Sequence, residues 1–318
     1  MTPAGTQEQL LAPRRGVEIR GRRKRRAAPY ALVAPALAVI ALVLGYPLYR
    51  LVALSFQHYS LAEIISHKTT WLGLRNYTTI FSDRQFWTIL QRTVEFTAFN
   101  VATTLVIGMA IAMLLRNVSG WARLLVNVAM VFVWATPVVV AVTIWQWLVD
   151  QQSGVLNYLL GHVLHVGNFE RHDWFSNPLS GFGIISALVI WGALPFVVIT
   201  LYAGVSQVPR ALEEAARVDG ATNWGVFRNV IYPIVKPLVL IVTSLSVIWD
   251  FGVFNQVYIM LNARPTSSYY LMSIYSYQES FGVGQYGRGA AIAMVIVFIL
   301  IIAAFFYTRQ LLRIGEIK

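Results

Sequence analysis

The sequence has no cysteine in its 318 residues, which excludes disulfide bonds, thiolate metal sites and thiol nucleophiles. Charge is scarce as well, because charged residues make up 12% of the chain whereas soluble domains carry about 25%. A Gly-rich phosphate loop ending in Gly-Lys-Ser or Gly-Lys-Thr is also absent, so the chain does not bind ATP through that motif. Hydrophobic residues account for 57%, and this composition argues against a globular enzyme.

Six long apolar segments follow one another along the chain. An α-helix needs about 20 residues to cross the hydrocarbon core of a bilayer, and each segment is close to that length or longer. We therefore predict an all-α integral membrane protein, and we expect Pro195 to break the fourth helix. The six transmembrane helices are predicted at about residues 29–54, 94–115, 124–149, 183–205, 238–261 and 289–307.

Basic residues indicate which side of the membrane each loop occupies. Residues 1–28 form a basic tail, and with the 116–123 turn, the 206–237 loop and the C-terminal tail they hold 17 of the 25 lysines and arginines. Basic residues in short loops collect in the cytoplasm. We therefore predict that both termini and the 206–237 loop are cytoplasmic. The net charge of +11 then reflects topology, and nucleic acid is not an expected partner.

The 206–237 loop is the most charged segment between two apolar ones in the second half of the chain. Ala211–Arg217 consists of strong helix formers, and Gly220 is suited to the left-handed conformation that ends a helix. Thr222 can cap a second short helix, which Pro233 is expected to end. Small apolar side chains on one face, with charged residues around them, make the first helix suitable for docking into a groove.

The residues of this loop resemble the EAA loop of ABC importer permeases. The stretch reads Glu214-Ala-Ala-Arg-Val-Asp-Gly-Ala-Thr-Asn-Trp-Gly-Val-Phe-Arg-Asn-Val-Ile-Tyr-Pro233. Val230 and Tyr232 replace the isoleucine and leucine that are usual near the end of the motif. The positions that match the motif are Glu214, Ala215, Ala216, Asp219, Gly220, Ala221, Phe227 and Pro233.

Further motifs extend the resemblance to residues 29–315, the predicted transmembrane permease domain. They are similar to sugar importer permeases of the maltose/glycerol-phosphate type, and they agree in order and spacing, which is more specific than one motif. Leu261-Asn-Ala-Arg-Pro265 departs from the Gly-Gly-Pro turn of many members. The matching segments include Pro29–Pro35, Gly45–Leu48, Leu72–Tyr77, Ile144–Trp147 and Gly154–Asn157.

This resemblance implies a type I ABC importer permease fold in a bacterial or archaeal cell membrane. The implied partners are a second homologous permease, two ATP-binding subunits, and an extracytoplasmic solute-binding protein or lipoprotein. ATP and magnesium would bind to the ATPase subunits and no cofactor to this chain. Because this chain has no ATP-binding motif, a partner subunit would hydrolyse ATP, and the permease itself is not expected to be an enzyme. The EAA loop would be the coupling helix that enters a groove on one ATPase subunit. An amphipathic helix at the membrane surface without a partner is the alternative.

Within this resemblance, Glu214 would pair with a basic or polar group of the ATPase. Ala215 and Ala216 would permit close approach, and Gly220 would permit the sharp turn. Residues Ser273–Tyr277 and Tyr286–Ala291 resemble permeases for disaccharides of the chitobiose or cellobiose kind. The sequence therefore suggests a carbohydrate substrate, most simply a di- or oligosaccharide, and leaves its identity open.

Asp250 is the one acid well inside a predicted span. Intramembrane charges are costly, so Asp250 is a candidate for contact with a sugar hydroxyl, although a hydrogen bond between packed helices explains it equally well. In an ion-coupled secondary transporter, which is the alternative function, it would be the coupling carboxylate. A stripe of Asp250, Phe254 and Tyr258 on one helix face could line a pore. The candidate pathway residues are Asn100, Gln146, Trp249, Asp250, Phe254, Asn255 and Tyr258.

Two other kinds of site are weaker candidates. His162 and His165 have a spacing that could hold a metal, but no acid pair lies near them in the sequence, and solvated loop histidines are the simpler interpretation. An intramembrane enzyme would need a nucleophile and base, or a set of metal ligands, within the spans. We find neither pattern in the sequence.

Overall fold

The computed structural model describes residues 32–315, with side chains to residue 313. The chain divides into two compact units, Met1–Leu51 and Val52–Lys318. The boundary falls within the helix Leu32–Ser55, which is labelled α2 from Tyr46 to Ser55. The predicted basic tail 1–28, the first residues of the predicted first span and Lys318 lie outside the described residues.

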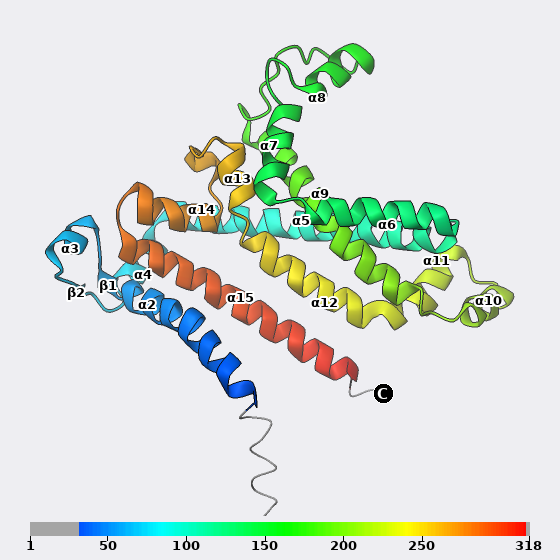
Figure 1. Ribbon diagram of the computed structural model, residues 1–318, viewed down its shortest axis with the longest axis horizontal. Coiled ribbons are helices and arrows are strands. Elements are labelled where there is room, and N and C mark those ends of the chain that lie inside the picture. The colour runs from blue at the N-terminus through cyan, green and yellow to red at the C-terminus, as the bar shows by residue number, and fades with distance from the viewer. Residues whose placement is uncertain (1–31, 316–318) are drawn as a thin grey trace, which may run out of the picture. The chain divides into compact units, whose positions relative to one another are not determined.

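The second unit is built almost entirely of helices (Figure 1). A two-residue hairpin, β1 (Gln57–His58) with β2 (Thr70–Trp71), is the one sheet in its described part. The helices are α3 (Leu61–Ser66), α4 (Arg75–Ser82), α5 (Arg84–Asn117), α6 (Gly120–Ala135), α7 (Val138–Leu148), α8 (Val155–Tyr158), α9 (Pro178–Val205), α10 (Arg210–Val218), α11 (Asn223–Val226), α12 (Tyr232–Phe251), α13 (Asn255–Met260), α14 (Met272–Tyr277) and α15 (Tyr286–Gly315). Shorter helical turns occupy Leu159–Val163, Phe227–Ile231, Ser267–Tyr269 and Gln278–Gly282.

Among the described residues, five helical segments are long and apolar enough to cross a bilayer, and the bent pair α6–α7 would make a sixth. This confirms the predicted fold class. The third predicted span, 124–149, is not one straight helix, because α6 and α7 meet at an angle of 101°. The bend lies at Thr136-Pro137, where the residue before proline takes an extended conformation and Pro137 has no N–H to continue the ladder.

The fifth predicted span, 238–261, is also interrupted. Helix α12 ends at Phe251, and α13 begins at Asn255 after a break that starts at Gly252. The prediction that Asp250, Phe254 and Tyr258 form a stripe on one helix is therefore wrong. Asp250 lies before the break, Phe254 at its end and Tyr258 after it, so the three residues do not follow one helical period.

Two prolines have effects other than those predicted. Pro195 does not break α9, which continues through it from Pro178 to Val205. Pro233 does not end a helix either, because Asn223–Phe251 forms one continuous helical segment. The wider turn Phe227–Ile231 immediately before α12 accommodates the prolines near the start of that helix. Prolines are tolerated inside membrane helices because neighbouring helices help to satisfy the backbone carbonyl groups whose hydrogen bonds the proline removes.

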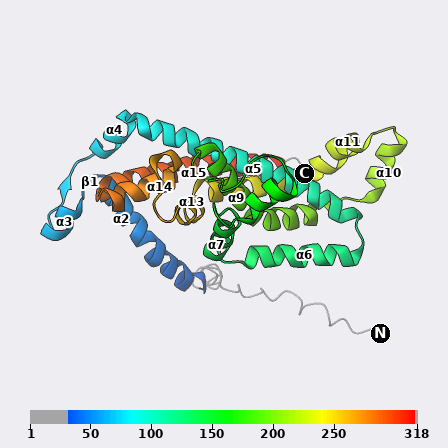
Figure 2. The same ribbon diagram turned by 90° about the horizontal axis from the view of Figure 1, so that it is seen from above.

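The core of the second unit forms where α5, α9 and α12 pack together. Figures 1 and 2 show α5 running alongside α9, with α10 and α11 together at one end of these helices. Gly108 of α5 lies directly against α9, because a Cβ atom built on Gly108 would approach Val197 Cγ1 to 2.6 Å. Small residues of this kind allow membrane helices to approach closely.

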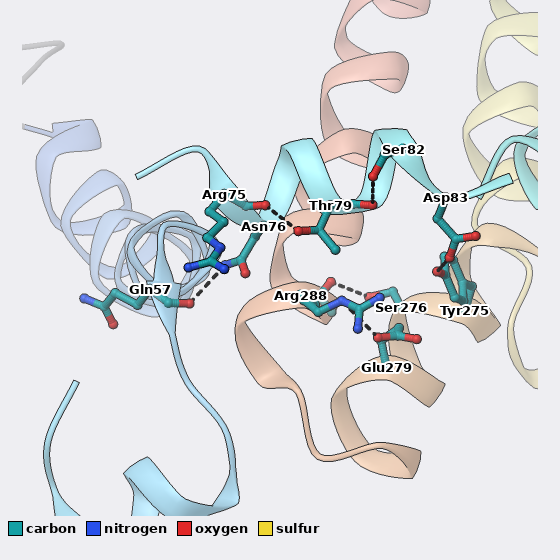
Figure 3. Close-up of polar contacts among 11 residues, drawn as sticks. Gln57, Arg75, Asn76, Thr79, Ser82, Asp83, Tyr275, Ser276, Glu279 and Arg288 are labelled. Atoms are coloured by element: carbon teal, nitrogen blue, oxygen red, sulfur yellow. Dashed lines mark hydrogen bonds and ion pairs between the residues drawn. The ribbon is translucent and has the colours of Figure 1, made fainter. Parts of the chain in front are cut away.

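A polar cluster lies at the other end of the core, between the start of α5 and the segment that precedes α15 (Figure 3). Arg288 Nε is 3.5 Å from Glu279 Oε2, and the Tyr275 hydroxyl donates to Asp83 Oδ2 at 3.4 Å. Burial raises the pKa of the Glu279 carboxyl above its ordinary value; Arg288 acts to lower this pKa and Asp83 to raise it. The cluster therefore holds two acids close to a single arginine.

Replacement of Gly108 by alanine should lower the free energy of unfolding by about 1–3 kcal/mol, because the new methyl group overpacks the contact with Val197. Thermal unfolding of the purified protein in detergent measures the effect. Gly183→Ala on α9 is the matched control, since nothing lies within 4 Å of a Cβ atom at Gly183. Equal stability of the two variants would contradict the close packing of α5 against α9.

The raised pKa of Glu279 predicts a pH dependence of stability. In the window above the ordinary glutamate pKa of about 4.3, the folded protein binds more protons than the unfolded chain. The free energy of unfolding should therefore fall as pH rises through this window, and Glu279→Gln should make the dependence shallower. Thermal unfolding at a series of pH values measures it, with the exposed Glu170→Gln as control. Identical slopes in wild type and Glu279→Gln would refute this explanation.

Candidate functional site

The loop between α9 and α12 is folded as a compact unit rather than as an extended connection. Helix α10 ends at Val218, and Gly220 then takes a positive φ of 86°, which the sequence predicted for the turn. The hydroxyl of Thr222 accepts a hydrogen bond from the backbone N–H of Gly225, so Thr222 caps α11 as expected. Asp219 lies at the end of α10, next to this turn.

Helix α10 presents one face outward. Ala211, Glu214, Ala215 and Val218 are exposed and follow the spacing of a single helix face. Val218 is 87% exposed, so its side chain has almost no contact with the rest of the described chain. The exposed face thus combines one carboxylate with small or apolar side chains.

The opposite side of the loop packs against the ends of the long helices. Ala216, Ala221 and Phe227 lie against a buried cluster to which α9, α11 and α12 contribute. Met109 and Met113 of α5 belong to the same cluster. Of the predicted coupling residues, Ala216, Ala221 and Phe227 therefore hold the loop in place. Glu214, Ala215, Asp219, Gly220 and Pro233 are exposed.

The sequence did not indicate that an arginine on α5 holds this loop. Arg116 Nη1 donates to the carboxylate of Glu213, and Arg116 Nη2 donates to the Val208 carbonyl at 2.8 Å. The two charged side chains are only 10% and 17% exposed. From the sequence, Arg116 was counted among the basic residues that indicate the side of the membrane, and Glu213 among the charged residues around the apolar face of the first loop helix. Nothing in their spacing shows that residues 97 positions apart meet.

The other arginine of the same turn has a different environment. Arg123 donates from Nε to the Leu115 carbonyl at 3.0 Å and from Nη2 to the Val118 carbonyl at 3.2 Å. Its guanidinium lies 5.6 Å from the centre of the Tyr202 ring. Arg123 thus closes the turn between α5 and α6 and contacts α9, whereas Arg116 contacts the loop.

A cavity of about 290 Å³ lies beside the bend between α6 and α7. The bend, the middle of α9 and the break after α12 border it together. Aromatic rings predominate among its larger side chains, and Phe196 and Trp249 form an edge-to-face pair with centroids 5.1 Å apart. The cavity is lined by Val133, Trp134, Thr136, Val138, Ala141, Leu188, Val189, Trp191, Gly192, Ala193, Phe196, Trp249, Asp250, Val253 and Gln256.

Asp250 is the acid of this cavity. Its side chain is buried, with the residue only 4% exposed, and Oδ2 has no hydrogen-bond partner in the described part of the chain. Trp249, the neighbouring predicted pathway residue, also lines the cavity. Trp191, Phe196 and Gln256 are lining residues outside the predicted set. Trp191 and Phe196 are five residues apart on α9, a spacing that does not place them on one helix face, so the sequence pattern does not identify them.

The other predicted pathway residues lie elsewhere. The amide of Gln146 donates to the Ile259 carbonyl at 2.7 Å, so it ties α7 to the end of α13. Phe254 and Tyr258 stack on each other with ring centroids 5.0 Å apart, and both rings contact Tyr277. Asn255 is exposed at the start of α13. None of these residues lines the cavity.

Asn100 lies inside the helix core. It is fully buried on α5, and Nδ2 donates to the Phe96 carbonyl at 2.7 Å. Its Oδ1 has no partner in the described part of the chain, and neither do the hydroxyl groups of Thr97 and Thr104 on the same side of α5. Ser246 of α12 is likewise buried, and its hydroxyl also has no partner in the described residues.

The residues that the structure describes contain no group of three or more His, Asp or Glu side chains placed to hold a metal ion. His162 and His165 are both exposed on the segment 150–177. His162 Nε2 lies 3.8 Å from Glu170 Oε1, an exposed pair. This arrangement agrees with the interpretation of both histidines as solvated loop residues.

Known proteins resemble this chain over most of its length. The family model of the binding-protein-dependent transport system inner membrane component matches residues 104–313. The diacetylchitobiose uptake system permease protein DasB of Streptomyces coelicolor is 38% identical over 289 residues, which cover 91% of this chain and 88% of that protein. The trehalose/maltose transport system permease protein MalF of Thermococcus litoralis is 26% identical over 290 residues, which cover 91% and 94%.

A solved structure has the same fold. It is a chain of a bacterial ABC transporter involved in the import of the acidic polysaccharide alginate, with a TM-score of 0.76 and 21% identity, and the match covers 92% of this chain and 98% of that chain. The family match, at residues 104–313, takes in α9, the loop with α10 and α11, and α12. The chain therefore belongs to the family of inner membrane components of binding-protein-dependent transport systems.

Proposed function

We propose that this chain is the permease subunit that forms half of the translocation pathway of an ATP-driven carbohydrate importer. The observation that carries the proposal is the exposed face of α10, with Glu214 and Ala215 directed outward from a loop that is packed against three long helices. A membrane protein that presents a short, rigid and charged helix in this way has the geometry needed to receive motion from another subunit. Two ATP-binding subunits, a second permease and a solute-binding protein complete the proposed complex.

The proposed coupling step follows from these contacts. Glu214 binds a basic or polar group at the groove of an ATPase subunit, and Ala215 allows the helix to approach the groove wall closely. When ATP draws the two ATPase subunits together, α10 moves with the subunit that it contacts. Because the loop is continuous with α9 and α12, the displacement reaches the two helices that border the cavity at Asp250.

We further propose that this cavity is the chain's contribution to the carbohydrate pathway. Aromatic rings can pack against the apolar faces of sugar rings, and the Asp250 carboxyl and Gln256 amide can hydrogen-bond to hydroxyl groups. A volume of about 290 Å³ is at the lower end for a small-molecule site, which agrees with a pathway shared between two permeases. The names of DasB and MalF support a di- or oligosaccharide as the substrate class.

The proposed orientation places both termini and α10 in the cytoplasm. Arg116, Arg123 and the loop lie together at one end of the α5–α9–α12 core, and Arg309 and Arg313 occupy the last turns of α15. Cytoplasmic loops carry an excess of basic residues, and this distribution supports the assignment. The segment 150–177 is then on the outer side, where a solute-binding protein delivers its ligand.

The coupling role predicts that Glu214→Lys or Gly220→Pro abolishes ATPase association or transport while membrane insertion remains intact. Lysine reverses the charge on the exposed face, and proline cannot adopt the positive φ of Gly220. Co-purification of the complex from membranes and sugar uptake measure the two effects. Glu170→Lys, the same change at an exposed acid of the outer segment, is the control. Normal association and transport in either loop variant would refute the role.

The same uptake assay separates the proposal from an ion-coupled transporter that uses Asp250. The importer stops when ATP is depleted and continues when the proton gradient is collapsed. An ion-coupled transporter behaves in the opposite way. No feature of the fold favours this alternative over the importer.

The cavity predicts that Asp250→Ala lowers transport about 10- to 100-fold, the effect of losing one charged or strongly polar hydrogen bond to substrate. Asn255→Ala should leave transport near the wild-type rate, because Asn255 does not line the cavity. Uptake of labelled disaccharide into proteoliposomes that contain the complete complex provides the measurement. Comparable losses in the two variants would place the pathway outside the cavity.

A further inference from the structure

Arg116 joins three parts of the molecule that are distant in sequence. It lies in the last turn of α5, its Nη1 group donates to Glu213 in the first turn of α10, and its Nη2 group donates to the Val208 carbonyl in the connection from α9. A planar guanidinium can hold two acceptors at a fixed mutual orientation, which an ammonium group cannot do. The contact therefore restricts both the position and the direction of α10 relative to α5.

The electrostatic environment favours the pair on both sides. A cation at a helix C-terminus and an anion at a helix N-terminus each interact favourably with the helix dipole, and Arg116 and Glu213 occupy these positions. Both side chains are largely shielded from solvent, so water competes little for the bonds. The apolar contacts of Met109 and Met113 with the loop lack such directionality, because flexible thioether side chains adapt to displacement.

Helix α5 leads from this contact into the core. Although α5 does not line the cavity, it packs along α9 and α12, which do. Gly108 brings α5 close to Val197 of α9, so the two helices meet with little space between them. A displacement applied to α5 at Arg116 is thus transmitted to α9 along its length, and not only at the end where α9 joins the loop.

We infer that Arg116 is a positioning residue for energy coupling, which locks α10 to α5 so that motion of the loop carries α5 together with α9 and α12. This inference rests on the proposed coupling role of the 206–237 loop. Glu214 contacts the ATPase, and the neighbouring Glu213 turns inward and transfers the force to α5. The Arg116–Glu213 pair stays bonded throughout the transport cycle, and its role is to keep α10 rigidly attached to α5.

The experiment uses the complete complex in proteoliposomes, with ATPase subunits, second permease, binding protein and disaccharide. Arg116→Gln should retain co-purification of the ATPase and its basal ATP hydrolysis. Stimulation by sugar-loaded binding protein and the amount of sugar transported per ATP should fall roughly tenfold, within the range of measured coupling effects. Arg116→Lys, which keeps the charge but not the two-pronged bond, should be intermediate. Arg123→Gln removes a charge from the same turn without touching the loop and is the matched control.

The absence of native cysteine permits a rescue test. In Arg116→Cys with Glu213→Cys, the two new thiols are the only ones in this chain, and a short bifunctional thiol reagent can join them. With cysteine-free partner subunits, the reduced double variant should lose stimulation and transport per ATP. Cross-linking the same sample should restore both, which a general folding defect would not allow.

Three outcomes decide between the hypotheses. Full stimulation in Arg116→Gln, or lost coupling that the cross-link does not restore in an intact complex, overturns the inference about Arg116. If Glu214→Lys abolishes ATPase association while the Arg116 variants remain fully coupled, the proposed function stands and this inference fails alone. If Glu214→Lys changes neither association nor transport, the proposed function fails.

Discussion

The structure depends on one constraint: no water is available in the core of a bilayer, so every backbone N–H and C=O group there must find a hydrogen-bond partner within the protein. It makes the spanning segments helical, and it means that an interrupted helix must be surrounded by protein. Within residues 32–315 two spanning segments are interrupted in this way, at Pro137 between α6 and α7 and at Gly252 after α12, and both interruptions border the same cavity. Ser273 donates to the Val253 carbonyl in the second break, and Gln146 donates to the Ile259 carbonyl at the end of α13, so side chains satisfy backbone groups where these helices stop. The cavity is thus a consequence of where the helices stop.

The loop between α9 and α12 is built as a stiff unit, which is what the proposed docking role requires. Its inner side is apolar and packed, its turn is formed by Gly220, and its first helix is bound to α5 through Arg116 and Glu213. Two consecutive acids therefore have different surroundings, because successive residues of a helix point in different directions. Glu213 faces the arginine, and Glu214 faces outward.

Much of the fold was predictable from composition and local pattern. The lengths of the apolar segments and the order of the motifs predicted a helical permease, and the family match and the structural match confirm it. The left-handed Gly220 and the cap at Thr222 were predictable because they depend on a few neighbouring residues. The coupling role of the loop, the pathway residues and the orientation remain predictions. Pro195 and Pro233 were misjudged because local helix rules take no account of neighbouring helices or of a wider turn that absorbs a missing hydrogen bond.

The sequence by itself determined the membrane environment, the number of apolar segments, the family and the local conformation of the loop, since these follow from hydropathy, short motifs and backbone preference. The tertiary structure alone decided which side chains meet. It directed Asp250 and Trp249 into a cavity, assigned Gln146 to a backbone contact, and brought Arg116 to Glu213. The physical reason is that each of these contacts joins separate helices. How separate helices pack in space is not encoded by the periodicity within any one of them.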